Sequence, residues 1–151
     1  RNYRKNDTPT LFRYGVLLIG LITTFRSFFG WKRNSQWNKL DRNLSLSFTI
    51  SLDLQLFVGL VLFLFYSNWG LKAIVNQGFS FVTRQEVFRF FAIEHGVIML
   101  LSFILAHLGN SFLKKVDESG RKYKRAFIFW GLAFVLILAG IPWSRPLFPN
   151  L

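Results

Sequence analysis

Four long apolar stretches separated by short polar segments dominate the pattern of hydrophobic and polar positions along the chain. We expect helices at about 10–31, 44–66, 87–113 and 126–143. The first stretch is uncharged between Arg13 and Arg26, and its roughly 22 residues would extend about 33 Å as a helix, enough to cross a bilayer. The last is shorter and ends near Pro142. The pattern predicts an all-α integral membrane four-helix bundle, with residues 1–151 as one domain.

Two other interpretations of these stretches fit less well. The buried helices of a soluble bundle would carry polar faces with a period near 3.6 residues, and the segments 54–65 and 127–141 show none. The first stretch is too long for a cleaved signal peptide, and it ends in a Gly-Trp-Lys-Arg run, not in a small-residue cleavage site. The chain does not begin with Met, so we expect that residues precede Arg1.

Tryptophan and tyrosine positions support these limits. Several lie within a few residues of an expected helix end, where amphipathic rings meet lipid headgroups: Tyr14, Trp31, Tyr66, Trp69, Trp130 and Trp143. The segment 71–83 mixes apolar and polar residues, and we expect a short amphipathic piece along the membrane surface there.

Composition fits a chain solvated by lipid and not by water. Charged residues make up 17% of the chain and aromatic residues 19%, with 19 Phe. The net charge of +12 alone would suit a nucleic-acid binder. The basic residues, however, lie mainly between apolar stretches and form no groove with stacking aromatics, so we expect no nucleic-acid partner. The absence of cysteine excludes disulfides, thiolate metal sites and covalent haem attachment.

The distribution of Lys and Arg predicts the topology. The connector 32–43 carries four, and 114–125 carries six. The other side, made of the N-terminus, the connector 67–86 and the C-terminal tail, carries six in total. Since cytoplasmic loops are enriched in Lys and Arg, the two short connectors are expected in the cytoplasm and both termini on the opposite side.

Ionisable side chains at membrane depth are the candidates for function, because they are costly in lipid and face the bundle interior or a partner. Counting along each helix places them in two layers. An inner layer holds Arg26, Asp53 and His107, and an outer layer holds Glu94 and His95, with Arg13 and Arg89 near the surface on that side. We therefore predict a buried polar network that includes Arg26, Asp53 and Glu94. Asp53 would either fix the helix register as one half of a buried pair or relay protons.

His95 and His107 are twelve residues apart, about 18 Å along a helix axis and about 120° apart around it. Such displaced imidazoles would suit a bundle that holds two haems, but the chain has no other histidine to complete either ligand pair. Two interpretations remain open. Each ring is hydrogen-bonded across a helix interface, or it ligates a haem alone or together with a partner chain's histidine. No metal is expected other than haem iron.

Short motifs in a fixed order carry a resemblance over nearly the whole chain. They are Arg13-Tyr14, Phe25-Arg26-Ser27-Phe28-Phe29-Gly30-Trp31, Asp41-Arg42-Asn43-Leu44-Ser45-Leu46, Gln55-Leu56-Phe57-Val58-Gly59-Leu60, Glu94-His95, Ala106-His107-Leu108-Gly109 and Gly140-Ile141-Pro142-Trp143. Together they resemble short bacterial four-helix membrane proteins labelled cytochrome b-like. The resemblance implies a multi-pass protein of the bacterial inner membrane, and the Lys and Arg distribution then places both termini in the periplasm. In the family pattern histidines occupy two positions that correspond here to Pro9 and Asp53, so both presumed haem-ligand pairs are broken.

Three functions follow as hypotheses. The first is a non-catalytic accessory subunit of a larger membrane complex, respiratory or otherwise redox-active, that packs against other membrane subunits in a hetero-oligomer and binds lipids. The second is an electron carrier that holds haem b through His95 or His107. The third is a small proton-coupled transport component that uses Asp53, Glu94 and the histidines. No nucleophile elbow, phosphate loop or H-E-x-x-H motif points to an enzyme.

Overall fold

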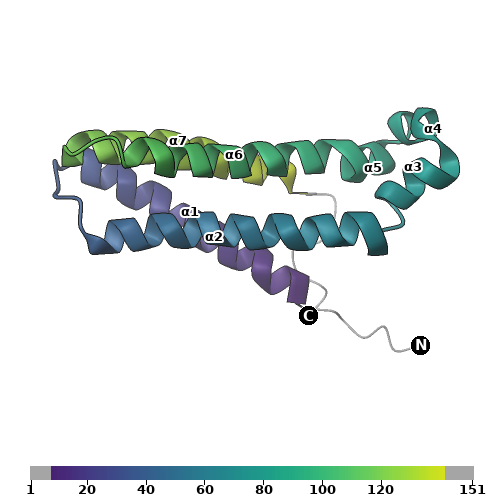
Figure 1. Cartoon of the computed structure of the whole chain (residues 1–151), viewed down its shortest axis with the longest axis horizontal. Coiled ribbons are helices and arrows are strands. Elements are labelled where there is room, and N and C mark those ends of the chain that lie inside the picture. The colour runs from purple at the N-terminus through teal and green to yellow at the C-terminus, as the bar shows by residue number, and fades with distance from the viewer. Residues whose placement is uncertain (1–7, 142–151) are drawn as a thin grey trace.

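Helices make up nearly all of the structure, a computed structural model that describes residues 8–141, with side chains from Arg13 onward. The four longest are α1 (Thr8–Lys32), α2 (Lys39–Val61), α6 (His95–Leu113) and α7 (Ser119–Gly140), labelled in Figure 1. Residues 8–141 contain no strand. Four helical segments are long and apolar enough to cross a membrane, as the sequence predicts, and the chain is a multi-pass membrane protein.

Shorter elements extend two of these helices and join them at one end. The π-helical turn η1 (Leu62–Tyr66) continues α2. Two short helices follow, α3 (Leu71–Gln77) and α4 (Phe79–Arg84), and they occupy the segment 71–83, where the sequence predicts a short amphipathic piece. Gly78 separates them with a φ of 85°, a conformation that favours glycine. Then α5 (Glu86–Arg89) and the π-helical turn η2 (Phe90–Glu94) lead directly into α6.

Two helices begin earlier than hydropathy predicts. The structure starts α2 at Lys39, not near residue 44, because the side chain of Asn38 accepts hydrogen bonds from the backbone N–H groups of Leu40 and Asp41. The structure also starts α7 at Ser119, not near residue 126. Hydropathy misses the first two turns of this helix because they are polar. Hydropathy marks the edge of the apolar segment, whereas helical hydrogen bonding continues beyond it.

The longer α7 overturns one prediction about the aromatic belt. Trp130 lies in the middle of α7, not near its end, and its side chain is fully buried among the helices. It is therefore a core residue and not an interfacial anchor. Trp143 and Pro142, also placed at a helix end by the sequence, lie outside the described residues.

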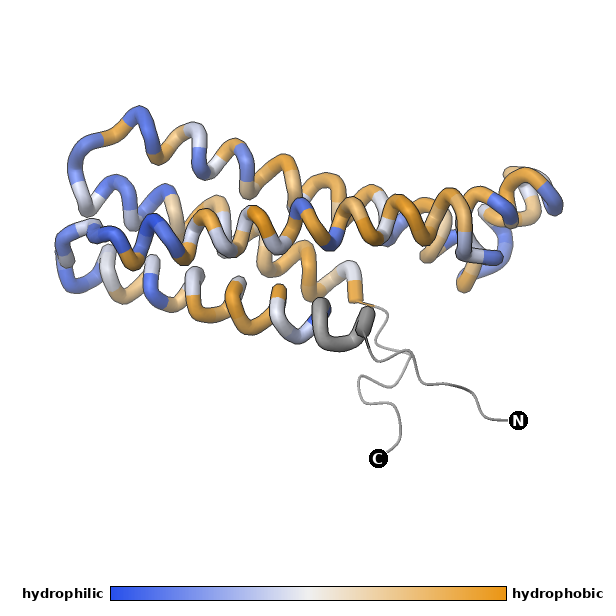
Figure 2. Tube along the Cα trace, turned by 60° about the horizontal axis from the view of Figure 1, so that its bottom comes forward, coloured by the Kyte–Doolittle hydropathy of each residue, from blue (hydrophilic) through white to orange (hydrophobic). Residues whose placement is uncertain are grey.

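The long helices pack side by side in the cyclic order α1, α2, α6, α7, and α7 also packs against α1. The connections α1–α2 and α6–α7 lie at the same end (Figure 1). They touch there: the backbone N–H of Trp37 donates to the hydroxyl of Ser119 over 3.0 Å. The two most basic connectors thus share one end, as the topology prediction requires, and hydrophilic positions gather at that end in Figure 2.

The interior combines small and polar side chains with a few large ones such as Phe48 and Trp130, while many large apolar side chains face outward. Buried positions recur every three or four residues along α6 and α7 and include Ser102, Ala106, Gly109, Ala126 and Ala133. Leu, Phe, Val and Ile side chains are exposed on all four long helices. Without a hydrophobic driving force between helices, small residues permit the close backbone approach that membrane helices need. The arrangement suits a chain surrounded by lipid.

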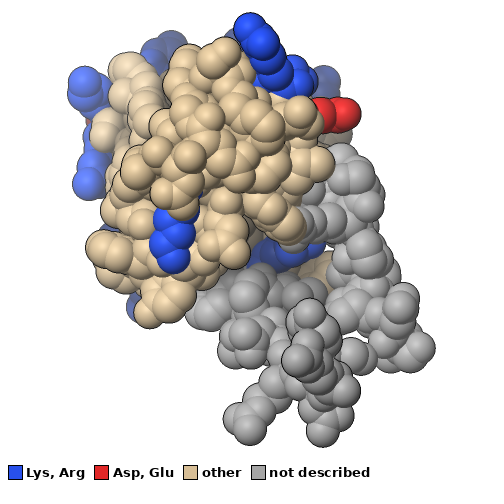
Figure 3. All heavy atoms as spheres, turned by 90° about the vertical axis from the view of Figure 1, so that its right-hand side faces the viewer, with Lys and Arg blue, Asp and Glu red and all other residues tan. Residues whose placement is uncertain are grey.

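The opposite end of the molecule has a different surface. Figure 3 views this end, where α3 and α4 join the long helices, and shows a largely uncharged surface with Lys and Arg mainly at its edges. Val75 on α3 and Phe79 on α4 are exposed apolar residues. The charge difference between the two ends follows the distribution of Lys and Arg along the sequence.

Candidate functional site

A polar cluster joins three helices at the end that carries the two short connections. The carboxylate of Asp41, 2% exposed, accepts hydrogen bonds from Nε of Arg26 at 2.5 Å and from the hydroxyl of Tyr123 at 2.6 Å. It also accepts one from the backbone N–H of Asn38 at 3.0 Å, which completes a capping box at the start of α2. One buried carboxylate therefore ties α1 and α7 to the first turn of α2.

Packing holds the phenol of this cluster in place. A Cβ atom on Gly30 would lie 2.4 Å from the ring of Tyr123, so only glycine lets α1 approach the ring this closely. The ring of Trp37 lies 4.9 Å from that of Tyr123, centroid to centroid. The phenol hydroxyl also lies 3.1 Å from the backbone oxygen of Gln36. These contacts make the cluster a structural lock, because its buried polar atoms are all engaged.

A second polar pair lies between α2 and α6. Nε2 of His107 is 2.8 Å from Oδ1 of Asp53. One side of the pair remains open, since 47% of the histidine side chain and 40% of the aspartate side chain are exposed. Asp53 is 14 residues into the continuous helix 39–66, close to its middle. The structure thus brings these two inner-layer residues together, but at the outer surface of the helices.

Further contacts fix this pair. The ring of Phe103 lies 4.4 Å from the imidazole of His107, one helical turn away. On the side toward the polar end, the Asn110 side-chain amide donates to the hydroxyl of Thr49 over 2.6 Å. The two cross-helix bonds set the register of α6 against α2.

The outer layer divides into two separate contacts. Arg89 donates from Nε to Oε1 of Glu94 over 2.7 Å, and both side chains are exposed. In a regular α-helix residues five apart point about 140° away from each other. The intervening π-helical turn η2, with its i to i+5 hydrogen bonds, brings them onto one side.

His95 forms a hydrogen bond across the interface between α6 and α7. Its Nδ1 lies 2.8 Å from the backbone oxygen of Gly140, in the last turn of α7. A carbonyl only accepts, so Nδ1 carries a proton and Nε2 is the unprotonated nitrogen of the neutral ring. This is the hydrogen-bonded arrangement that the sequence offered as one of two interpretations. Glu94 and His95 bind different targets, as their adjacent helix positions predict.

The polar groups differ from the predicted buried network, because Arg26, Asp53 and Glu94 belong to three separate pairs and their side chains are 37–44% exposed. Arg26 was expected near Asp53 and His107, but it binds Asp41, which hydropathy had left in a connector. The sequence does contain a signal for this carboxylate, since Asn38-x-x-Asp41 is a capping-box pattern before an apolar run. Glu94 pairs with Arg89 and not with the inner layer.

Each of the two histidines already has one ring nitrogen in a hydrogen bond within the chain, which limits its capacity to ligate a haem iron. Nε2 of His107 is engaged by Asp53, whereas His95 keeps Nε2 for another partner. Both rings come from α6, and the described residues contain no third imidazole. The described part of one chain therefore does not fit a haem with two histidine ligands. It also contains no cluster of three or more His, Asp or Glu residues that would hold a metal ion.

Comparison with protein-family models, curated proteins and solved structures finds no match to this chain. The resemblance to cytochrome b-like proteins stays a prediction from the motifs. The functional argument therefore rests on the geometry of the polar pairs within the spanning helices.

Proposed function

We propose that the chain is a non-catalytic accessory subunit of a larger membrane complex, and that the surface formed by α2 and α6 around Asp53 and His107 binds another membrane subunit. The observation that carries this proposal is the half-exposed polar pair at membrane depth. We place the complex in a bacterial inner membrane, with the connections α1–α2 and α6–α7 in the cytoplasm, on the basis of the motifs and the Lys and Arg distribution.

The energetic argument concerns what covers this pair. An aspartate at the centre of a spanning helix costs about 2.5–3.5 kcal/mol on insertion scales. The bond to His107 offsets part of this cost, but nearly half of each side chain would still contact lipid. A helix of another subunit with a hydroxyl, amide or backbone group at this depth would satisfy the remaining hydrogen-bonding capacity. Exposed apolar residues beside the pair, Ile50 and Phe57 on α2 and Leu100 and Ile104 on α6, would pack against it.

The test is native electrophoresis of the tagged full chain, extracted from its own membrane in mild detergent. We expect the wild type to migrate with a larger assembly, and Asp53→Leu or His107→Leu to migrate alone while remaining helical by circular dichroism. Ser51→Ala is the control, because the Ser51 hydroxyl bonds the carbonyl of Ser47 in its own helix and no other group among the described residues. A wild-type chain that migrates alone, or an Asp53→Leu chain that stays in the assembly, contradicts the proposal.

A haem-binding role through His95 is the second candidate. Ligating histidines usually donate their other ring nitrogen to a carbonyl or carboxylate, as Nδ1 of His95 does to Gly140. Nearby aromatic rings, of Phe90 at 6.0 Å and Phe91 at 6.4 Å, would give an apolar surround. The same purified assembly tests this role. Reduced-minus-oxidised bands that vanish in His95→Ala support it, and a spectrum without them refutes it.

A further inference from the structure

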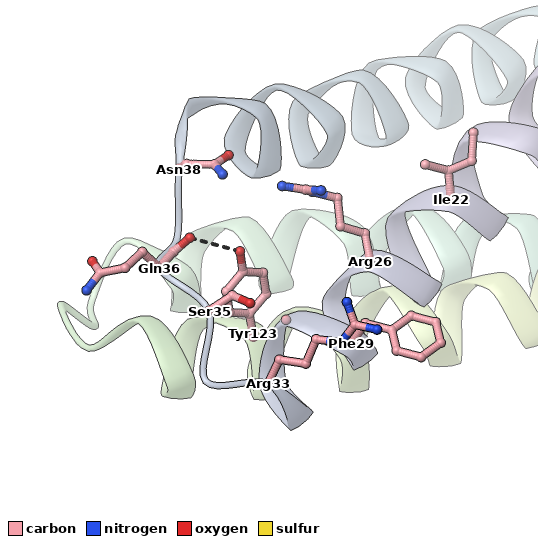
Figure 4. A pocket seen from close by; sticks show the side chains of 9 residues that line it. Ile22, Arg26, Phe29, Arg33, Ser35, Gln36, Asn38 and Tyr123 are labelled. Atoms are coloured by element: carbon pink, nitrogen blue, oxygen red, sulfur yellow. Dashed lines mark hydrogen bonds between the residues drawn. The ribbon is translucent and has the colours of Figure 1, made fainter.

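An open groove of about 670 Å³ lies at the polar end of the molecule, between the last turns of α1 and the start of α2. Figure 4 shows its lining side chains: the guanidinium of Arg26 points across it toward Asn38, while Arg33 and Ser35 lie near its loop end and Ile22 at the other. The groove is distinct from the pair between α2 and α6, since it is lined by α1, the 33–38 connection and Tyr123 of α7.

One stripe of α1 forms the wall of this groove. Ile22, Arg26 and Phe29 are spaced by four and three residues, so they lie on one face of α1, and Arg33 follows four residues later, just past the end of the helix. Arginine and large apolar side chains alternate along this stripe. A ligand lying along it would meet cations and hydrocarbon in turn.

The polar part of the groove offers mainly hydrogen-bond donors. Arg26 uses Nε for Asp41, and its terminal nitrogens have no partner among the described residues. The Arg33 guanidinium contacts only the ring of Phe29, at 5.5 Å, within that same part of the chain. The Asn38 side-chain oxygen is occupied by the backbone of α2, which leaves its NH₂ group as a donor.

The carboxylate beside the groove, that of Asp41, is already occupied. One oxygen of the Asp41 carboxylate binds Arg26, and the other binds Tyr123 and the backbone of Asn38. Arg26 balances the negative charge of Asp41, so the positive charge of Arg33 is left without a counter-charge in the groove. The lining therefore selects an anion, and arginine guanidinium groups suit phosphate oxygens in particular.

The apolar side chains of the groove, Ile22 at one end and Phe29 between the two arginines, open toward the lipid-facing surface. Ile22 and Phe29 are exposed, and Phe25 and Leu21 continue the exposed apolar surface of α1 beside them. A free inorganic anion would gain nothing from this surface. A molecule with a phosphate and a hydrocarbon chain would use both parts at once.

We propose that this groove is a binding site for one anionic phospholipid, with its phosphate between Arg26 and Arg33 and an acyl chain along Ile22 and Phe29. The basic connectors at the same end attract anionic lipid to the leaflet in which the groove opens. The site holds the lipid by paired arginine contacts at the headgroup and by apolar contact below it.

Native mass spectrometry of the purified full chain, titrated with dioleoyl phosphatidylglycerol, tests the site. We expect one tightly bound lipid in the wild type and an affinity lower on the order of ten-fold in Arg33→Gln, because a charge-assisted hydrogen bond is lost. Arg33 is exposed and makes no ion pair among the described residues, so we expect Arg33→Gln to leave the fold unchanged. Lys115→Gln is the control, since it removes a cation at the same end but on the connection that follows α6, which does not line the groove.

Dioleoyl phosphatidylcholine, which has the same chains but no net charge, is expected to bind more weakly, and millimolar inorganic phosphate is expected not to displace the lipid. Equal affinity of wild type and Arg33→Gln overturns the proposal. An equal loss in Lys115→Gln also overturns it, because the attraction would then be spread over the whole basic end. Displacement by inorganic phosphate would show that the groove binds a free anion and no lipid.

Discussion

Replacing Tyr123 by Phe tests whether the buried cluster around Asp41 locks the helices together. The change removes one hydroxyl and leaves the ring packed against Gly30 and Trp37. The hydroxyl has a single proton, and the 2.6 Å contact to the Asp41 carboxylate identifies its main acceptor. A hydrogen bond to a charged group contributes about 1.5–3 kcal/mol in soluble proteins, whereas bonds between membrane helices average about 0.6 kcal/mol.

We expect Tyr123→Phe to lower the free energy of unfolding by about 1–2 kcal/mol. This loss in free energy is smaller than the cost of burying a carboxylate with no hydrogen-bond partner, because Arg26 and the backbone of Asn38 still bind Asp41. Unfolding of the purified chain from mild detergent into increasing SDS, followed by circular dichroism, measures the change. Tyr66→Phe is the matched control, since Tyr66 is 72% exposed.

A double-mutant cycle with Asp41→Asn separates the hydrogen bond from general packing. If the hydroxyl acts through the carboxylate, the two substitutions together cost less than the sum of their separate effects. Strictly additive losses, or a Tyr123→Phe chain as stable as the wild type, would refute the lock.

Three substitutions probe local packing and capping, each by the same SDS titration. Gly30→Ala is expected to destabilise the chain by about 1–3 kcal/mol, because its Cβ would overlap the ring of Tyr123; unchanged stability would contradict this close approach. Gly15→Ala, which meets nothing within 4 Å, is expected to be neutral or to stabilise α1 by about 0.5–1 kcal/mol, and a loss would mean an unseen contact. Asn38→Ala is expected to cost about 1 kcal/mol through loss of the α2 cap, and no loss would show that the cap is dispensable.

The spanning segments could be predicted from the sequence because lipid solvation imposes a length and an apolar composition on them. The starts of α2 and α7 could not, since their first turns are polar and hydropathy treats polar turns as loops. The error carried over to Trp130, which looked interfacial only while α7 was expected to begin near residue 126. The identity of the core was also hidden, because large apolar residues occur both in the interior and on the exposed faces, and no polar stripe marks the outside.

Part of the polar geometry followed from depth alone. Counting from the helix ends placed Asp53 and His107 in one layer, and the structure joins them. Depth does not specify whether a pair lies inside the helices or on their outer surface, and this pair lies on the outer surface. The partner of Arg26 was missed for a different reason: Asp41 was counted in a connector, although its position three residues after Asn38 is a capping signal.

Site-specific photo-crosslinking in the native membrane tests the central claim most directly, that a partner subunit covers the surface around Asp53 and His107. A benzophenone amino acid would replace Phe57 on α2, Ile104 on α6 or, on α7, the exposed Val135. The account predicts that positions 57 and 104 crosslink to the same polypeptide, that Asp53→Leu abolishes both products, and that position 135 gives neither. Crosslinking to lipid alone at positions 57 and 104, as at 135, would contradict it.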